Sequence, residues 1–312
     1  MASPSKRVIL KMFVLLSAVC MLLYFFANSC HISVYHEINN RRTRACNEEC
    51  VQTKTYPKFN ICLYENSEDI YISVSIRSQG LWDNDLTLKI HAALTLYPNA
   101  TFIDIGANIG YFALYACTLS KNVVAIEAVS RNAKMVYKGL SLNTCKGNVI
   151  VLNNAISNGR TRVSMQENRG NNMGGLAVSK EELAVHVERS PSNLTWVEAI
   201  TIDDILPYVG SNDVVTLDIE GYECKALESS VKFFQVKTVH YIFMEWLFVR
   251  DRIQQPNASC PLEAAQNMVA RLAAMGFIPS EYNPKQKLLD IKQVASWDSN
   301  DIVWRHKDVV PV

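Results

Sequence analysis

The segment TFIDIGANIGYFALYA, residues 101 to 116, decides the fold of this chain. Residues 101 to 105 form an apolar, β-rich run, Gly106 and Gly110 bracket a short turn, and helical character resumes at Tyr111. Glycine permits the tight turn and lets a ligand approach the backbone, and the following helix N-terminus offers free N–H groups. The pattern predicts a strand, a turn and a helix that bind a nucleotide-type cofactor. Purely structural turns also use glycine, so the motif needs support from its context.

That support comes from the next expected strand, residues 122 to 128, which ends near Glu127. Glu127 lies 21 residues after Gly106, at the spacing where a carboxylate accepts hydrogen bonds from both hydroxyls of a ribose. The competing interpretation is a solvated strand end.

The residues around the turn also bear on the type of cofactor. A dinucleotide site requires G-x-G-x-x-G, but Asn108 stands in the middle of the turn and Asp104 lies two residues before Gly106. A carboxylate would repel a pyrophosphate and attract a positively charged ligand. The turn therefore argues against NAD, and it resembles motif I of the S-adenosylmethionine-dependent methyltransferases, in which the acid faces the positively charged methionine end of the cofactor.

A second segment has the same character. An apolar strand at residues 213 to 217 leads into DIEGYE, residues 218 to 223, and an amphipathic helix follows. Taken with DIGANIG, with TIDDIL at 201 to 206 and with HYIFMEW ending near Glu245, this order of motifs resembles the FkbM family of S-adenosylmethionine-dependent methyltransferases. The chain departs from the family pattern in having E-A where E-P is usual after the second strand, and TIDD for TLDD. The resemblance covers residues 80 to 280, in an animal-type, membrane-anchored arrangement.

The resemblance implies an α/β, Rossmann-like class I methyltransferase fold, with a doubly wound, mostly parallel sheet and an antiparallel C-terminal strand. It also implies S-adenosylmethionine as the cofactor. The cofactor-binding residues would be Asp104, Gly106, Asn108, Gly110, Glu127, Asn154 and Ala155. The catalytic residues would be Asp218, Glu220 and Glu245, at the sheet edge where open α/β folds bind ligands. Glu223 is a weaker candidate, and all the acids of this segment have the alternative role of capping the next helix.

The implied reaction is displacement of a methyl group by an oxygen nucleophile, which needs positioning and removal of a proton. None of the six histidines falls within a motif, and His240 is expected to be a structural residue. Carboxylates are therefore the expected bases. A divalent metal held by them is an open alternative, but no metal ligand is assigned from the sequence.

The N-terminus differs from the rest of the chain. Residues 8 to 27 are apolar except for Lys11 and Ser17, long enough for one membrane span. We expect a cytoplasmic tail at 1 to 7, a transmembrane anchor at 8 to 27, a stem at 28 to 56 and a methyltransferase domain at 57 to 312. A cleaved signal peptide and a secreted product are the alternative.

Cysteines and sequons favour a lumenal side. Outside the expected span eight cysteines remain, an even number that suits disulfides in an oxidising compartment, although Cys117 and Cys145 also fit ordinary buried thiols. Asn99, Asn193 and Asn257 begin glycosylation sequons. The sequence thus predicts a type II membrane protein whose domain faces the Golgi or endoplasmic reticulum lumen.

Three further elements are expected. Residues 61 to 76 alternate as a hairpin does, and residues 82 to 97 are expected to form a helix with Asp83 near its start. Residues 158 to 196 are expected to form a long polar loop that covers the acceptor, with a simple surface insertion as the alternative.

The expected function is O-methylation of a glycan, glycolipid or other secretory-pathway hydroxyl. The alternatives are a dinucleotide-dependent oxidoreductase of the same fold and an inactive, membrane-anchored binding protein. A net charge of +1 and the lack of a basic stripe argue against a nucleic-acid partner. The sequence does not indicate an oligomeric state.

Overall fold

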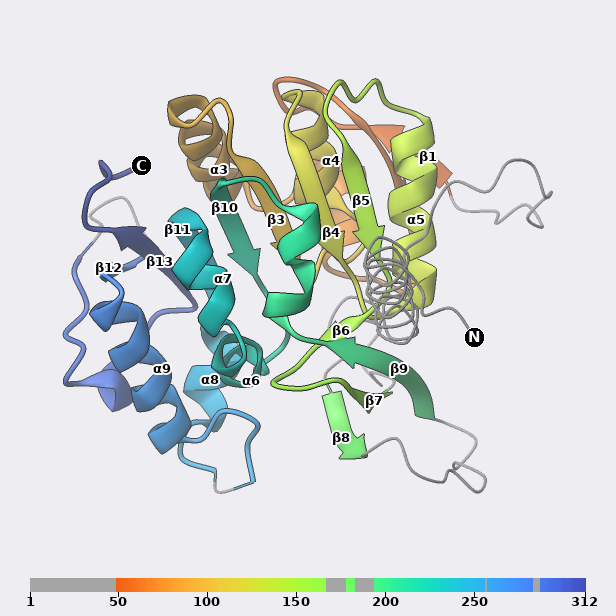
Figure 1. Ribbon diagram of the computed structural model, residues 1–312. Coiled ribbons are helices and arrows are strands. Elements are labelled where there is room, and N and C mark those ends of the chain that lie inside the picture. The colour runs from red at the N-terminus through yellow and green to blue at the C-terminus, as the bar shows by residue number, and fades with distance from the viewer. Residues whose placement is uncertain (1–48, 167–177, 183–193, 256, 283–286) are drawn as a thin grey trace, which may run out of the picture.

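A seven-stranded sheet forms the centre of the molecule (Figure 1). The structure is a computed structural model that describes residues 49–166, 178–182, 194–255, 257–282 and 287–312. Its strand order is β12-β13-β11-β10-β3-β4-β5. The bounds are β3 Thr101–Ile105, β4 Asn122–Ile126, β5 Val149–Leu152, β10 Asn212–Leu217, β11 Thr238–Glu245, β12 Phe277–Glu281 and β13 Asp301–His306. Only β13 runs against the other six strands. The predicted doubly wound, mostly parallel sheet with an antiparallel C-terminal strand is confirmed.

Helices cover both faces of this sheet because its strands are apolar on both sides (Figure 1). Neighbouring residues of β3 show the division, since Phe102 belongs to one core and Ile103 to the other. The Phe102 core includes residues of α3 Asn84–Leu96, α4 Tyr111–Thr118 and α5 Ser130–Ser141. The Ile103 core includes residues of α6 Glu223–Glu228, α7 Val231–Val236, α8 Leu247–Arg252 and α9 Leu262–Ala274. Short 3-10 helices, Ile202–Tyr208 and Val294–Ser296, complete the connections.

The region before the sheet begins earlier than expected and is partly helical. β1, Glu49–Gln52, lies in the range expected as the stem, yet it pairs with β2, Asn60–Leu63. Residues 61 to 76 do not form a hairpin by themselves, because α2, Ile72–Gln79, takes up the second half of that range. The predicted helix at 82 to 97 is confirmed as α3, and the Asp83 side chain caps it by accepting a hydrogen bond from the Leu86 N–H.

The range expected to be a long loop contains a second sheet. β7, Thr161–Gln166, pairs antiparallel with β8, Val178–Glu182, and with β9, Leu194–Ile200, and β9 pairs in parallel with β6, Ala155–Ile156. The loop prediction was wrong for these strands because their alternating pattern is short and interrupted. The glycine-bearing stretch 168 to 175 lies outside the described residues.

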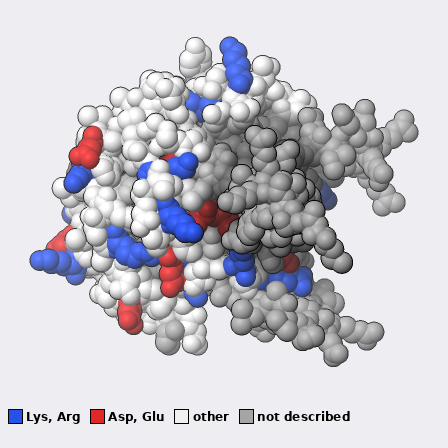
Figure 2. Space-filling view, in the orientation of Figure 1, with Lys and Arg blue, Asp and Glu red and all other residues white. Residues whose placement is uncertain are grey.

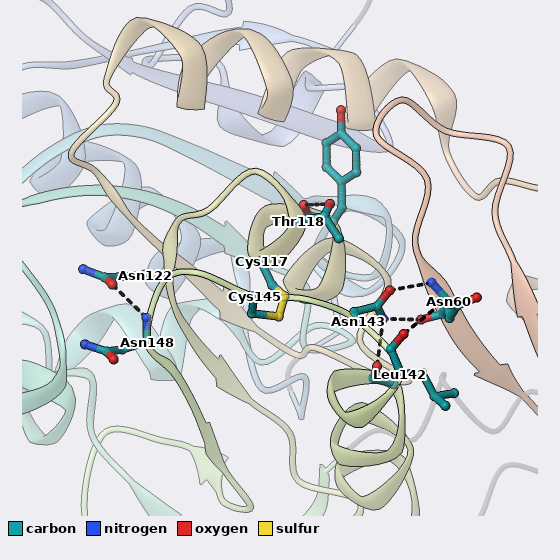
Figure 3. The surroundings of a disulfide bond; sticks show 10 residues. Asn60, Cys117, Thr118, Asn122, Leu142, Asn143, Cys145 and Asn148 are labelled. Carbon is teal, nitrogen blue, oxygen red and sulfur yellow. Dashed lines mark hydrogen bonds between the residues drawn. A yellow bond between two sulfur atoms is a disulfide. The ribbon is translucent and has the colours of Figure 1, made fainter.

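Three disulfides join cysteines that are far apart in the sequence: Cys50–Cys62, Cys117–Cys145 and Cys224–Cys260. The interpretation of Cys117 and Cys145 as buried thiols was wrong, because α4 and the segment after α5 bring them together (Figure 3). Close by, Asn143 joins the end of α5 to β2 through hydrogen bonds with both backbone groups of Asn60. Cys30 and Cys46 lie outside the described residues.

The expected membrane anchor, residues 8 to 27, also lies outside the described residues. Within the part of the chain that the structure does describe, no helix has the length and apolar character needed to cross a membrane. Of the three sequon asparagines, Asn99 and Asn257 are exposed, and Asn193 is outside the described ranges.

Candidate active site

A cavity of about 530 Å³ lies at the carboxyl ends of the parallel strands, a volume typical of small-molecule sites. It is lined by nine of the predicted residues: Asp104, Gly106, Asn108, Glu127, Asn154, Ala155, Asp218, Glu220 and Glu245. In the space-filling view, acidic side chains are visible in the hollow over the carboxyl ends of β3 and β10 (Figure 2). The sheet therefore gathers residues from five segments into one site.

The glycine turn closes tightly against the second motif. Gly106 has φ 89°, and a Cβ there would overlap the carbonyl oxygen of Asp218, so only glycine fits. Asn108 also has a left-handed backbone, with φ 51°, which asparagine tolerates better than most residues. The prediction that Gly110 binds the cofactor was wrong, because Gly110 does not line the cavity. It is the N-cap of α4, with φ 91°, and packs against Val136.

Glu127 is held by backbone donors. Its Oε2 accepts the Asn108 N–H at 2.7 Å and its Oε1 accepts the Val129 N–H at 2.7 Å. Burial raises the pKa of this carboxyl to about 7, against the opposing effect of those hydrogen bonds. Oε1 also accepts a hydrogen bond from the Asn132 side-chain amide at 3.4 Å, so the remaining lone pair of Oε2 is the one that can accept a hydrogen bond from a ligand.

Asp104 is almost fully buried, with only 3% of its surface exposed, yet it lines the cavity. Its Oδ1 accepts a hydrogen bond from the Thr216 hydroxyl at 2.7 Å, whereas Oδ2 has no partner among the described residues. Burial raises the pKa of Asp104 to about 6. A buried carboxylate oxygen without a partner is costly, and a cationic ligand would remove that cost.

Asn154 links the cavity to the second sheet. Its side-chain amide donates to the carbonyl of Glu198 on β9 at 3.1 Å. Met165 of β7 and Val178 of β8 line the same part of the cavity. The second sheet therefore forms one wall of the site, next to Ala155.

Asp218, Glu220 and Glu245 form an acidic group at the ends of β10 and β11. Glu245 shares a hydrogen bond with Asp218, and burial together with the Asp218 charge raises the pKa of Glu245. Glu245 is therefore the protonated partner, donating to Asp218, at neutral pH. Burial, with the nearby charges of Asp218 and Glu223, raises the pKa of Glu220 to about 8. A carboxylate with that pKa is a far stronger base than an ordinary glutamate.

Glu223, the weaker candidate, does not line the cavity. It is fully buried, and its Oε1 accepts the N–H groups of Ile219 and Gly221 at 3.1 and 3.3 Å. His240 is likewise structural. It stacks on Tyr97 with ring centroids 3.6 Å apart and does not line the cavity.

The residues of the site that the sequence interpretation missed include Asp83, Tyr282 and Asp301. The Tyr282 hydroxyl donates to Asp83 Oδ1 at 3.2 Å, and Asp301 lies opposite Glu245 in the β11–β13 pair. Burial raises the pKa of Asp83 to about 6 and that of Asp301 to about 7. Asp83 carried only a helix-capping signal, and the other two follow no motif. Among the described residues, no group of three or more His, Cys, Asp or Glu side chains is arranged to hold a metal.

The solved structures that are similar to this chain include two methyltransferases of low sequence identity. Precorrin-6y C5,15-methyltransferase from Geobacter metallireducens is 10% identical over 72% of this chain and 87% of its own, with a TM-score of 0.34. TYW2 from M. jannaschii, in complex with AdoMet, is 14% identical over 87% of this chain and 90% of its own, with a TM-score of 0.33. Scores this low do not establish a shared function. No curated protein matches the chain.

The family model of the methyltransferase FkbM domain matches residues 104–279. This range is more than half of the chain and runs from Asp104 into β12, so it includes the glycine turn, Glu127 and the acidic group of Asp218, Glu220 and Glu245. Asp83, Tyr282 and Asp301, which complete the cavity, lie outside it. The chain belongs to the FkbM-domain methyltransferase family.

Proposed function

We propose that this protein is an S-adenosylmethionine-dependent O-methyltransferase that acts on a hydroxyl of a glycan, a glycolipid or another secretory-pathway acceptor. The observation that carries the proposal is the acidic lining of the cavity. Seven carboxyl groups line it, from Asp83, Asp104, Glu127, Asp218, Glu220, Glu245 and Asp301, and no Lys, Arg or His is among its described lining residues. A lining of carboxyl groups attracts a positively charged sulfonium cofactor and repels the pyrophosphate of a dinucleotide.

The residues present fit S-adenosylmethionine. The unpartnered Oδ2 of Asp104 would accept a hydrogen bond from the ammonium group, and Glu127 would accept those of the ribose hydroxyls. Ala155, with Asn154 and Met165 near it, offers an apolar position for the adenine. When bound, the cofactor supplies an electrophilic methyl group.

The acidic group prepares the acceptor. Sheet order puts Glu127 and Asn154 beyond β3 on one side of the cavity, and Asp218, Glu245 and Asp301 on the other. The acceptor therefore lies over β10 and β11, where Glu220 takes its hydroxyl proton as the general base. Burial raises the pKa of Asp218, the hydrogen bond with Glu245 opposes that rise, and Asp218 orients the same hydroxyl.

The wall also restricts the acceptor. Carboxyl groups accept hydrogen bonds from sugar hydroxyls, and aromatic side chains such as Trp82 and Phe248 pack on the apolar faces of a sugar ring. A phosphate, sulfate or carboxylate would meet repulsion with no cation in the lining to offset it. We therefore favour an uncharged hydroxyl-bearing group.

Location is a proposal that rests on separate observations. Three disulfides suit an oxidising lumen, and two of the sequon asparagines are exposed and accessible for glycosylation. Together with the apolar segment at 8 to 27, they support a type II anchor with the domain in the Golgi or endoplasmic reticulum lumen. An endoglycosidase that changes the mass of the expressed protein would support this location, and a domain accessible to cytosolic protease would contradict it.

Calorimetric titration of the protein with S-adenosylmethionine, S-adenosylhomocysteine and NAD tests the cofactor. We expect the first two to bind and NAD not to bind. Mass spectrometry of glycans and lipids from cells with and without the protein then tests the acceptor, through a gain of one CH2 unit. NAD binding would favour the oxidoreductase alternative. Failure of all three ligands would favour the inactive binding protein.

A further inference from the structure

The backbone that presents Glu220 is held in an unusual conformation. Glu220 has φ 61° and Gly221 has φ 92°, so two consecutive residues are left-handed and only one of them is glycine. A left-handed glutamate is strained and persists only where surrounding contacts fix it. The contacts that fix this turn therefore control where the Glu220 carboxyl points.

Two side chains supply those contacts from different elements. Glu223, at the start of α6, accepts hydrogen bonds from the Ile219 and Gly221 N–H groups. Arg252, at the end of α8, donates from Nη1 to the carbonyl oxygen of Glu220 at 3.1 Å. The turn is thus held on both its donor and its acceptor side.

Arg252 also touches the cavity wall. Its guanidinium lies over the Phe248 ring, 4.7 Å from the centroid, and Phe248 lines the cavity. A Cβ on Gly221 would come within 3.2 Å of both Arg252 Nη1 and Phe248 Cβ, so glycine makes the close approach of Arg252 possible. One arginine therefore joins the Glu220 turn, α8 and the aromatic wall.

We propose that Arg252 is a positioning residue for the methyl-transfer reaction, which holds the Glu220 carboxylate in its productive place. It does not touch the reacting atoms. The inference rests on the proposed function, in which Glu220 is the base, and adds a residue that no sequence motif indicated.

The charge of Arg252 gives the inference a distinctive signature. The titratable groups around Glu220 are Asp218 at the end of β10, Glu245 at the end of β11, Glu223 on α6 and Arg252 on α8. Burial and the charges of Asp218 and Glu223 raise the pKa of Glu220, and the charge of Arg252 lowers it. Removing the cation would therefore raise the pKa further, and activity that needs ionised Glu220 would require a higher pH.

Two variants and a matched control separate positioning from general packing. Arg252→Met removes both the charge and the hydrogen bond, and Arg252→Lys keeps the charge but loses the planar guanidinium group with its several N–H donors. The control is Arg271→Met, because Arg271 Nη1 donates at 3.2 Å to the carbonyl of Glu228, at the other end of the same helix α6 and outside the cavity.

We expect kcat/KM of Arg252→Met to fall about 10- to 100-fold, as it does when a catalytic group is displaced. The rise of kcat/KM on the acidic side of the pH profile should also move to higher pH. Arg252→Lys should lose activity, but its kcat/KM should rise with pH over nearly the same range as in the unmodified protein. Arg271→Met should match the unmodified protein in both activity and pH profile. S-adenosylmethionine affinity should stay within a few-fold in all three. The inference is overturned if Arg252→Met and Arg271→Met have the same pH profile.

A second measurement does not depend on catalysis. Hydrogen exchange of the ligand-free protein should be faster at residues 219 to 221 in Arg252→Met than in Arg271→Met. Equal exchange in the two variants would show that Arg252 does not hold the turn, even if no methyl transfer were detected. If the unmodified protein did not bind the cofactor, the proposed function would be contradicted. The hydrogen-exchange comparison would still test whether Arg252 holds the turn.

Discussion

At the scale of single residues, burial is what turns ordinary carboxyl groups into site residues. Asp104 and Glu220 both have raised pKa values, to about 6 and about 8, and in both burial is the largest cause. They differ in their surroundings. Asp104 is held by Thr216 on the strand and keeps one unpartnered oxygen, whereas Glu220 stands on a turn among other acids. The first environment suits cation binding and the second suits proton transfer.

Replacement of Asp104 by Asn should weaken S-adenosylmethionine binding about 10- to 100-fold, the equivalent of losing one hydrogen bond to a charged group. Titration calorimetry measures the change. Asp213→Asn is the matched control, because Asp213 is fully buried on neighbouring β10 but lies at the opposite end of the sheet, outside the cavity. If both variants bound the cofactor equally well, Asp104 would not face its cationic end.

Replacement of Glu220 by Gln should lower kcat about 10²- to 10⁴-fold, the usual contribution of a general base, with little change in cofactor affinity. In the unmodified protein, kcat/KM should rise with pH up to about 8, because Glu220 must lose its proton before it can accept one. Steady-state kinetics across pH 6 to 9 checks both points. Retained activity in Glu220→Gln would move the role of base to Asp218.

At the scale of elements, the site depends on close contact between the β3–α4 turn and the end of β10. The Asp218 N–H donates to the Ile105 carbonyl at 3.0 Å, and Gly106 leaves no room for a side chain against Asp218. The two sequence motifs are therefore packed against each other directly. A change in one turn displaces the other.

Gly106→Ala should lower the free energy of unfolding by more than about 1 kcal/mol, because it adds both an unfavourable φ and an overlap with the Asp218 carbonyl. Urea unfolding measures the loss. Gly159→Ala serves as the control, since a Cβ at Gly159 meets no atom within 4 Å. Equal stability of the two variants would mean that the β3–α4 turn can move away from β10 at little cost.

At the scale of the whole molecule, the accumulation of buried carboxyls links stability to pH. Asp83, Asp104, Glu127, Asp213, Glu220, Glu223 and Asp301 all have pKa values raised to about 6 to 8. Acids with raised values bind protons more tightly when folded than when unfolded. Stability contributed by those protons is present at low pH and is lost as pH rises through the folded values.

The ligand-free protein should therefore be more stable near pH 5 than near pH 8, with the loss falling between about pH 4 and 8. Thermal unfolding with the disulfides intact, at several pH values, measures the trend. Glu68 and Asp204 have lowered pKa values and stabilise the folded protein only once their carboxyls are ionised, and burial lowers the pKa of His240, so these three groups oppose the trend of the seven carboxyls. Stability that rose steadily from pH 5 to 8 would show that these carboxyls are ionised in the folded state.

The parts of the site that the sequence could predict share one property: each stands at the end of a parallel strand. Asp104, Glu127, Asp218 and Glu245 follow or end apolar runs, and parallel strands put their carboxyl ends at one edge. Asp301 and Asp83 could not be predicted in this way. Asp301 begins the antiparallel strand β13 and Asp83 caps α3, so only packing of the chain brings them to that edge.

The sequence by itself determined the strand–turn–helix pattern, because that pattern depends on local periodicity and on glycine at required positions. Its resemblance to a known family implied the sheet type and the acids of the cofactor site. Tertiary structure alone decided the pairing of the disulfides, the sheet formed by β6 to β9, and the meeting of Arg252 with the Glu220 carbonyl. Those features join segments with no shared local pattern. Their energies depend on distances that exist only once the chain has folded.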